Sequence, residues 1–519
     1  MHLPEEIYTT LSDDFIFNST EFAVYEALNA CPTSNSSPDG ISFKLLKSVA
    51  GHIIRPLNIV FQHSLHDGTF PQSWKHAVVI PIYKGKGDRS SSSNYRPVSM
   101  CSCLGKLLEK VIHTQLITFL NNRNSLHTAQ HGFTSGRSTL TNLLEYDVSI
   151  ADCLAMGHPY DIITFDFSKA FDKLPHQCVI DAMVSFGIRG KALKWLSSFL
   201  TERTQQVKVG NSLSDVCDVL SGVVQGSVLG PIMYVMATNS LLAAIKLPCG
   251  AFADDLKFIV DVVKNTRNTA QDNIDIVANW AEAHHMPISI EKSGVMHCGR
   301  NQPNHEYMLC GHPMACMDKI VDLGVIRSLN SSYSDQCQAV ATKAMRTANV
   351  IRRCFCTGAP KLLWPAFQSY VSPLLMYCSP VWTPNNQRDI AILERVQRRF
   401  TKSIRGMRDL SYTERLHSLG ALTLQHRRLF ADMTTAFKSL RGLMNCSSLS
   451  LGLALSTSNT REGGVRLTQR KIVSKVHRSL FCCRSPTEWN NLPLEVINCQ
   501  SLAQFKRRLL KFVLIRQNS

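Results

Sequence analysis

The sequence reads AFADDLKFIV over residues 251–260, where two adjacent carboxylates separate two short apolar runs. This pattern predicts a tight β-hairpin whose turn carries Asp254 and Asp255. Two neighbouring acids repel each other, so a fold gains little by burying them together. A divalent cation removes the repulsion, and carboxylate oxygens suit Mg²⁺ or Mn²⁺. Most Asp-Asp pairs are solvated turns, so only a second acidic site would make metal binding the better interpretation.

A second acidic site lies about ninety residues upstream, in the segment YDIITFDFSKAFD at 160–172. A β-branched and aromatic run leads into Asp166, and small and polar residues follow it, which indicates a strand that ends at Asp166. Such a strand could bring Asp166 beside Asp254 and Asp255. Three carboxylates from two strands can hold two metal ions about 3.5–4 Å apart, an arrangement that supports in-line displacement at phosphorus. One metal then activates an attacking 3′-hydroxyl and the other stabilises a pyrophosphate leaving group.

The composition and the charge distribution limit the class of protein. A chain of 519 residues with 44% hydrophobic and 18% charged residues is globular and long enough for two to four structural units. Residues 1–337 hold 27 Lys and Arg against 31 Asp and Glu, whereas residues 338–519 hold 29 against 8. The whole excess of the net charge of +17 therefore lies in the C-terminal third. This asymmetry favours a polyanion-binding surface there, with a membrane surface as the lesser alternative.

Cysteines and apolar stretches argue against two other classes. The 18 cysteines include no Cys-x-x-Cys pair, so we expect reduced thiols and no structural zinc. The start of the chain is neither basic nor apolar, so we expect no signal peptide. Residues 219–245 contain no charged side chain, but they include Gln225, Pro231 and Asn239. We therefore expect a buried segment and no membrane span.

The segment FDFSKAFD at 165–172 resembles the first palm motif of reverse transcriptases from non-LTR retrotransposons of the LINE type, especially the jockey-like group. Further resemblances follow in the order of that family: NYRPVS at 94–99, HGF at 131–133 with GRS at 136–138, GVVQGSVLGP at 222–231, FADD at 252–255, ISIEKS at 288–293 and LGV at 323–325. The resemblance implies an α+β right-hand polymerase with fingers and palm, followed by an all-helical basic thumb and a C-terminal extension.

The resemblance and the helical periodicity together predict four segments: an N-terminal lead-in at 1–61, fingers and palm at 62–326, a helical, basic, thumb-like domain at 327–441, and a linker with a basic tail at 442–519. Apolar spacing predicts helices at 103–122, 266–284, 388–404 and 423–441. The sequence Ser411-Tyr412-Thr413-Glu414 predicts a capping box that starts another helix. Residues 442–465 are poor in charge and rich in Ser, Leu and Gly, which favours a linker.

The resemblance also implies roles for individual residues. Asp166, Asp254 and Asp255 would hold two Mg²⁺ or Mn²⁺ ions. Lys292 matches a lysine that is a candidate general acid for the departing pyrophosphate. Lys84 and Arg96 would contact the triphosphate of the incoming nucleotide, and Phe167, Phe171 and Gln225 would shape its pocket. The ring of Phe171 would collide with a 2′-hydroxyl, so deoxynucleoside triphosphates would be preferred.

The implied function is RNA-directed DNA synthesis that extends a DNA primer on an RNA template, in the nucleus, the cytoplasm or both. The family commonly carries an endonuclease further upstream, and this chain starts only a few dozen residues before the loop at 37–41. We therefore expect that it does not cut DNA unaided.

Two alternatives remain open at this point. One is a decayed copy that binds RNA or RNA–DNA hybrid without polymerising, because Thr134, Val224 and Ser240 depart from the family pattern. The other is a two-metal nuclease, against which Phe171 and Gln225 argue, because a nuclease has no need to select a sugar.

Overall fold

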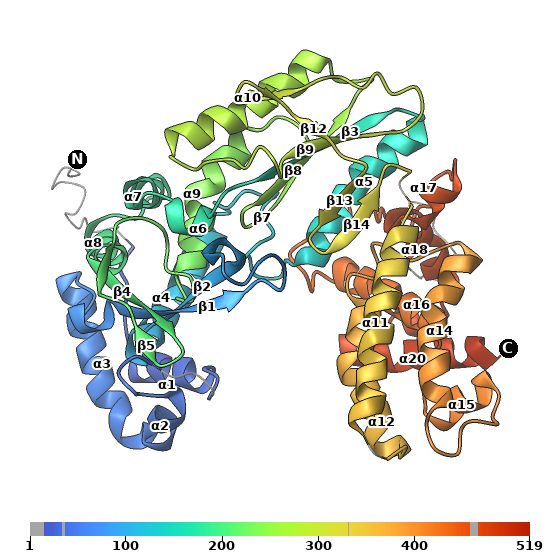
Figure 1. Cartoon of the computed structure of the whole chain (residues 1–519), viewed down its shortest axis with the longest axis horizontal. Coiled ribbons are helices and arrows are strands. Elements are labelled where there is room, and N and C mark those ends of the chain that lie inside the picture. Colours follow the sequence, from blue (N-terminus) through green and yellow to red (C-terminus); the bar gives the residue numbers. More distant parts are fainter. Residues whose placement is uncertain (1–14, 34–36, 331, 356, 457–464, 519) are drawn as a thin grey trace.

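The chain forms an arch with two large buried cores and a smaller third cluster of buried residues (Figure 1). The computed structural model describes residues 15–33, 37–330, 332–355, 357–456 and 465–518. One core lies in the N-terminal half and includes residues from Phe17 to Met314. The other lies in the C-terminal half and includes residues from Val325 to Val513, together with Leu143 and Leu144. The architecture is thus mixed, with sheets in the first half and helices in the second.

A five-stranded sheet with the order β12-β9-β3-β8-β7 lies at the top of the arch (Figure 1). Its strands are β3 (Tyr160–Asp166), β7 (Cys249–Phe252), β8 (Asp255–Asp261), β9 (Gly294–Cys298) and β12 (Ala315–Cys316). The central strand β3 is antiparallel to both β8 and β9. Its β-branched and aromatic side chains are almost all buried, as expected for a strand covered on both faces. The register pairs Asp166 with Asp255.

The predicted hairpin at 251–260 is confirmed, with one difference. Phe252 pairs with Asp255, so the turn consists of Ala253 and Asp254 alone. Ala253 adopts the left-handed backbone conformation with φ of 57°, which such a short turn requires. Asp255 therefore begins β8 and does not lie in the turn. This placement sets Asp255 opposite Asp166 on the neighbouring strand.

A second sheet, with the order β2-β1-β4-β5 and with β6 on β4, lies at the left of the arch (Figure 1). Strand β1 (His76–Tyr83) is antiparallel to β2 (Tyr95–Met100) and parallel to β4 (Arg203–Val209). Short strands β5 (Ser212–Leu213) and β6 (Cys217–Val219) complete it.

Helices pack around these sheets. They include α4 (Cys103–Asn122), α7 (His176–Ser185), α8 (Gly190–Leu200), α9 (Gly230–Ala244) and α10 (Arg267–Ala283). The helices predicted at 103–122 and 266–284 are confirmed. The uncharged stretch 219–245 contains α9, which is buried on nearly every side. Among the described helices, none combines the length and the apolar character that a membrane crossing needs.

The N-terminal helices belong to the first core. Helix α1 (Glu21–Asn29) packs on α3 (Ala50–Asp67) and on α4, and the short α2 (Phe43–Ser48) precedes α3. Phe17, Leu28, Phe43 and Phe61 are buried there. The described part of the predicted lead-in at 1–61 is therefore an integral layer of this half.

The second half is helical, as predicted. Its main helices are α11 (Ser334–Cys354), α12 (Pro360–Tyr370), α14 (Gln387–Lys402), α15 (Tyr412–Ser418), α16 (Leu424–Leu440), α18 (Phe481–Asn490) and α20 (Leu502–Asn518). Helix α14 buries Leu393, Val396 and Phe400 on one face. The capping box between Ser411 and Glu414 begins α15.

The linker expected at 442–465 is not what the structure shows. Cys446, Leu451 and Leu453 are buried in the second core, between helices of that half. Helix α20 further along packs on α16 through Phe505, which stacks on Phe437. Part of the segment is therefore packed in the core; its residues 457–464 lie outside the described residues.

Helix α5 (Thr139–Met156) and a buried charge network connect the two halves. Lys257 on β8 lies 2.6 Å from Asp322, which ends β13 (Lys319–Asp322). Arg327 on β14 (Val325–Ser328) lies 3.2 Å from Asp322 and 2.7 Å from Asp147 of α5, the latter an ion pair without hydrogen-bond geometry. Burial alone would raise the pKa of Asp322, but the charges of Lys257 and Arg327 outweigh it and lower that pKa. The network therefore binds β8, the β13–β14 hairpin and α5 together.

We expect the substitution Arg327→Met to lower the free energy of unfolding by about 3–5 kcal/mol, because it leaves Asp147 buried without its partner. Urea or thermal unfolding of the full chain measures the change. Lys319→Met is the matched control, since Lys319 pairs with Asp335 at the exposed end of the same hairpin. Equal losses in both variants would show that burial of the network does not matter.

Candidate active site

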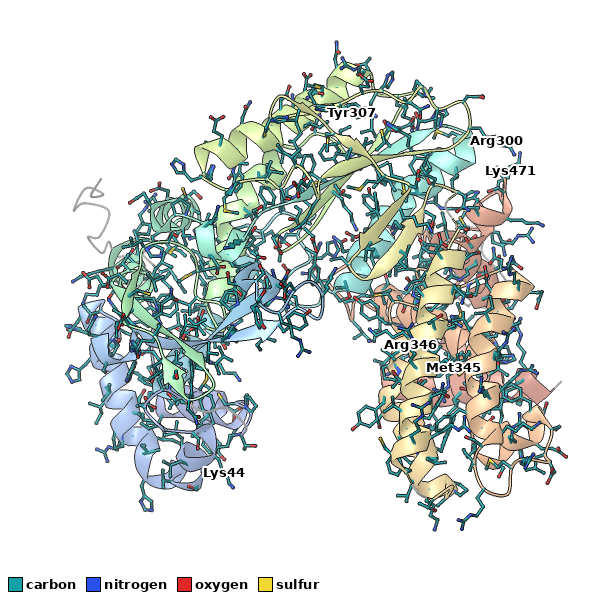
Figure 2. All side chains as sticks on the ribbon, in the orientation of Figure 1. Lys44, Arg300, Tyr307, Met345, Arg346 and Lys471 are labelled. Atoms are coloured by element: carbon teal, nitrogen blue, oxygen red, sulfur yellow. The ribbon has the colours of Figure 1, made fainter. Side chains whose placement is uncertain are left out.

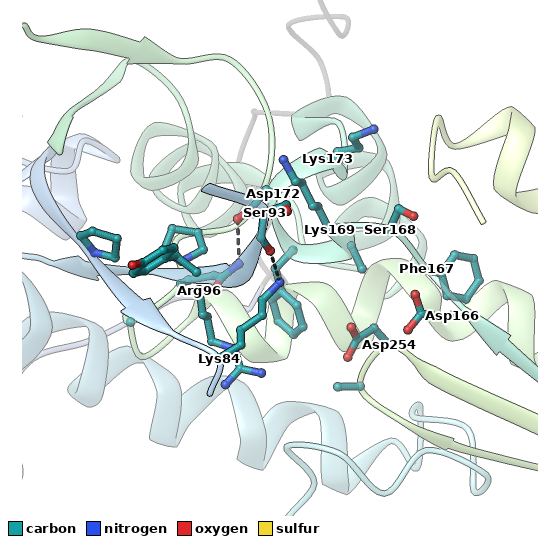
Figure 3. Close-up of a pocket in the computed structure, with 18 of the residues that line it drawn as sticks. Lys84, Ser93, Arg96, Asp166, Phe167, Ser168, Lys169, Asp172, Lys173 and Asp254 are labelled. Atoms are coloured by element: carbon teal, nitrogen blue, oxygen red, sulfur yellow. Dashed lines mark hydrogen bonds between the residues drawn. The ribbon is translucent and has the colours of Figure 1, made fainter. Parts of the chain in front are cut away.

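All nine predicted site residues line one cavity of about 1540 Å³ between the two sheets. They are Lys84, Arg96, Asp166, Phe167, Phe171, Gln225, Asp254, Asp255 and Lys292. Figure 3 shows Asp166 and Asp254 with their carboxyl groups close together, and Lys84 and Arg96 on the β1–β2 side. The cavity thus joins an acidic wall to a basic one.

The acidic wall is built by strand register. Asp166 is the last residue of β3, Asp255 is the first of β8, and the two pair directly. Asp254 is the second residue of the two-residue turn between β7 and β8. The backbone of Asp166 is fixed in turn, because its N–H donates to Ser293 Oγ and its carbonyl accepts from Ser289 N–H. Three carboxylates from two neighbouring strands therefore share one end of the sheet.

The protonation of these acids reflects their crowding. Burial raises the pKa of Asp254, and the charge of Asp166 adds to the rise. Asp255 keeps an exposed edge, yet the protein around its carboxyl group and the charge of Asp254 raise its pKa to about 6. Lys292 Nζ lies 3.1 Å from Asp166 Oδ2 and offsets part of this charge. Hard oxygen donors with such unrelieved repulsion fit divalent cations.

Residues 130–132 clamp the turn that carries Asp254. Gln130 Oε1 accepts hydrogen bonds from Ala253 N–H at 3.1 Å and Gly132 N–H at 2.8 Å. His131 N–H donates to the Ala251 carbonyl at 2.9 Å. A Cβ at Gly132 would lie 2.4 Å from Ala253 N, so only glycine fits there. Sequence reasoning identified His131 and Gly132 by resemblance and missed Gln130.

Phe171 and Gln225 also line the cavity. The ring of Phe171 stacks on Tyr234 of α9 with centroids 4.3 Å apart. Gln225 Nε2 donates to Asp172 Oδ1 at 2.7 Å. The backbone carbonyl of Gln225 accepts from Ser99 N–H of β2. Tyr234 and Asp172 were missed as site residues. Asp172 is part of the quoted 165–172 motif, whereas Tyr234 gave no signal inside an uncharged helix.

Cations occupy the basic wall. Lys84 Nζ donates to the Ser93 carbonyl at 2.9 Å, and Arg96 pairs with Ile82 across β1 and β2. Lys169 and Lys173 also line the cavity, and neither was singled out from the sequence. A polyanionic group between the two walls would therefore meet lysines on both sides of it.

The three departures from the family pattern differ in position. Val224 lines the cavity beside Gln225. Thr134 Oγ1 donates to the Gly132 carbonyl at 3.2 Å, which supports the clamp. Ser240 Oγ accepts from Trp280 Nε1 at 3.1 Å and does not line the cavity. Of the three, Val224 is the one that touches the candidate pocket directly.

A second cluster of metal-ligand residue types lies behind the clamp. His131, Glu145 and Cys446 bring their ligand atoms within 4.8 Å of one another. His131 Nε2 lies 2.9 Å from Glu145 Oε2 and 3.3 Å from Arg137 NH1. The guanidinium already supplies the positive charge, so this cluster does not itself indicate a metal.

Residues 83–331 match the family model described as reverse transcriptase (RNA-dependent DNA polymerase). The chain is 26% identical over 295 residues to the probable RNA-directed DNA polymerase from transposon BS of Drosophila melanogaster, which covers 52% of this chain and 31% of that protein. It is 27% identical over 273 residues to the RNA-directed DNA polymerase from mobile element jockey of the same organism, covering 49% and 29%.

A further relative is the retrovirus-related Pol polyprotein from type-1 retrotransposable element R2 of Popillia japonica, 28% identical over 256 residues, covering 46% of this chain and 34% of that one. The chain thus spans about a third of the length of the curated relatives that it matches. A solved structure of apo telomerase from Candida tropicalis, truncated from its C-terminal domain, is 14% identical with a TM-score of 0.37 and covers 57% of this chain and 62% of that chain. A TM-score this low adds nothing to the fold described above.

We expect the substitution Asp255→Asn to raise the melting temperature of the metal-free protein at pH 8 by on the order of a few degrees. The pKa of about 6 in the folded chain exceeds the ordinary value of 3.8, so ionisation of Asp255 destabilises the fold as the pH rises through 6. At pH 5 the wild-type carboxyl group is largely protonated, and the difference should shrink. Differential scanning fluorimetry in EDTA at both pH values measures it.

Asp218→Asn on the exposed strand β6 serves as the control. An Asp255→Asn variant that melts below the wild type at pH 8 would contradict the repulsion argument.

Proposed function

We propose that this chain, whose residues 83–331 match the reverse transcriptase family model, extends a DNA 3′-hydroxyl on an RNA template, as the polymerase of a non-LTR retrotransposon. The observation that carries the proposal is the convergence of Asp166, Asp254 and Asp255 with a pocket built from Phe171 and Gln225 in one cavity. The carboxylates supply a site for phosphoryl transfer, and the pocket supplies a means of selecting the nucleotide. A nuclease would need the first and not the second.

Reverse transcriptases as a family use divalent metal ions. We propose two Mg²⁺ or Mn²⁺ ions held by Asp166, Asp254 and Asp255. When bound, they activate the primer hydroxyl and neutralise charge on the phosphates. The raised pKa values of Asp254 and Asp255 support this assignment, because burial and the charges of the neighbouring carboxylates both disfavour ionisation without a cation.

The side chains of the cavity have complementary roles in the proposal. Lys84 and Arg96 bind the triphosphate and offset its charge in the transition state. Phe171, held flat against Tyr234, excludes a 2′-hydroxyl, and Phe167 lines the same pocket. Lys292, 3.1 Å from Asp166, donates a proton to the departing pyrophosphate. Such an acid contributes typically 10²–10⁴-fold in rate.

Template and primer are proposed to lie along the basic helices of the C-terminal half. Exposed cationic side chains on α11 and α14 are Lys343, Arg346, Arg352, Arg353, Arg388, Arg395, Arg398, Arg399 and Lys402. The two acids of α14, Asp389 and Glu394, are buried. Helix α11 lies on the side of this half that faces the sheet with the order β2-β1-β4-β5 (Figure 1). Figure 2 shows Arg346 on this helix. This surface therefore presents positive charge without exposed acids on α14.

The location of the chain in the nucleus, the cytoplasm or both is also part of the proposal. The described cysteines are all free thiols, most of them buried, which suits a reducing compartment. Synthesis at a chromosomal target would place the activity in the nucleus.

We expect the full chain to incorporate dTTP on poly(rA)·oligo(dT) in the presence of Mg²⁺ or Mn²⁺. Asp254→Ala should abolish incorporation, because it removes a carboxylate that neither remaining acid can replace. Incorporation is measured with labelled dTTP, and hybrid binding is measured in parallel. A folded wild type that binds the hybrid without extending it would favour the decayed copy. Cleavage of a labelled duplex without dNTPs would favour the nuclease.

We expect the double substitution Arg395→Ala with Arg399→Ala to weaken hybrid binding and to flatten its salt dependence. Each lost phosphate contact reduces the slope of log K against log salt by roughly 0.7–0.9. Fluorescence anisotropy at several salt concentrations measures both. Lys506→Ala with Arg507→Ala on α20 removes the same charge from the tail. Equal effects of the two double variants would assign the binding to overall charge and not to α14.

A further inference from the structure

Glu109 is a buried carboxylate on α4 with an unusual set of partners. Only 1% of the residue is exposed. No lysine, arginine or histidine among the described residues forms an ion pair with it. Its Oε2 atom instead accepts hydrogen bonds from the backbone N–H groups of Val228 at 2.7 Å and Leu229 at 3.1 Å. The side chain thus contacts the start of a different helix, more than a hundred residues away.

Helix α9 depends on this contact because its own sequence cannot supply it. The residue at its N-cap is Leu229, which has no side-chain acceptor, and Pro231 follows at the first turn. Leu229 is fully buried, so water cannot satisfy its N–H group. An unsatisfied buried donor costs free energy, and the positive end of a helix favours a negative charge. Glu109 therefore caps α9 from α4, while Ser227 Oγ accepts only the Gly230 N–H.

The capped segment carries the nucleotide pocket on both sides of the cap. Gln225 lies three residues before Val228, in a loop whose backbone is tied to Phe171 through Val223 N–H. Tyr234 lies one turn into α9 and forms the surface against which Phe171 stacks. A shift of the start of α9 would therefore move Gln225 and the support of Phe171 together.

We infer that Glu109 is a positioning residue for the nucleotide pocket, which holds Gln225 and Phe171 in place by capping α9. The inference rests on the proposed polymerase function and names a residue outside the cavity lining. Loss of the cap therefore impairs nucleotide binding and sugar selection, whereas binding of the hybrid is unaffected.

The chain contains a matched control for this device. Glu394 of α14 is also buried and accepts from Leu424 N–H at the start of α16, again from a neighbouring helix. Its helix lies in the C-terminal half and carries no residue of the cavity. Glu394→Ala therefore removes a buried acceptor from the start of a helix outside the cavity, and α16 retains the cap that its own Thr423 side chain provides to His426 N–H.

The test compares Glu109→Ala, Glu109→Asp, Glu109→Gln and Glu394→Ala in the full chain. Steady-state primer extension on poly(rA)·oligo(dT) gives the KM for dTTP, and incorporation of UTP gives sugar discrimination. We expect Glu109→Ala to raise the KM for dTTP about tenfold or more, corresponding to the loss of a buried hydrogen-bonded charge. The KM of Glu109→Asp should lie between those of the wild type and Glu109→Ala, because the shorter side chain draws the accepting oxygen back from α9. Glu109→Gln should keep most of the wild-type affinity for dTTP, because its amide oxygen still accepts both hydrogen bonds. Binding of the hybrid should stay within about twofold.

The outcomes separate the inference from the function on which it rests. A KM for dTTP unchanged in Glu109→Ala and Glu109→Asp, or raised equally in Glu394→Ala, would overturn the inference. Should Glu109→Ala fail to fold, the Asp and Gln variants decide. A wild type that binds hybrid without extending it would refute the polymerase function. Stabilisation of a chain-terminated primer complex by dTTP would then still compare the variants, and equal stabilisation in all of them would refute the positioning role.

Discussion

Electrostatic repulsion among Asp166, Asp254 and Asp255 is the constraint around which the rest of the structure is arranged. The register of β3 against β8 forces Asp166 opposite Asp255, and the two-residue turn adds Asp254 beside them. Nothing in a hydrophobic core would favour this arrangement. The surroundings stabilise it at a distance: Lys257 follows two residues later on β8, and through Asp322 and Arg327 it ties this strand to α5. These buried ion pairs stabilise the strand positions that place the three repelling carboxylates together.

Hydrogen bonds to the backbone also hold the β7 side of the turn in place. Gln130 and His131 bind the backbone of residues 251–253, and Gly132 has no side chain because Ala253 occupies that space. The positions of the carboxylates are thus set by main-chain hydrogen bonds and close backbone packing. This is the kind of preorganisation that electrostatic catalysis requires.

The sequence predicted much of this from local patterns, and its failures have physical causes. Two apolar runs around an acidic pair located the hairpin at 251–260, and helical periodicity located α4 and α14, because both signals are local. The exact place of Asp255 depended on pairing with Phe252, which is a tertiary fact. Tyr234 and Glu109 were missed because a buried aromatic and a helical acid are ordinary residues until their neighbours are known. The segment at 442–465 looked like a linker because composition cannot distinguish a solvated, uncharged stretch from one that a helical core covers.

Helix α5 gives the molecule a particular order of events during its synthesis. Asn142 donates to the Ala251 carbonyl beside the turn that carries Asp254, while Leu143 and Leu144 on the same helix lie in the C-terminal core. Asn445 N–H bonds to the Gly136 carbonyl, and Asp152 pairs with Arg470, across more than three hundred residues of chain. At translation rates of about 5–20 residues per second, the C-terminal residues that cover one face of α5 are made on the order of tens of seconds after α5 itself. The N-terminal half therefore leaves the ribosome with an apolar face of α5 uncovered until the C-terminal half has been made.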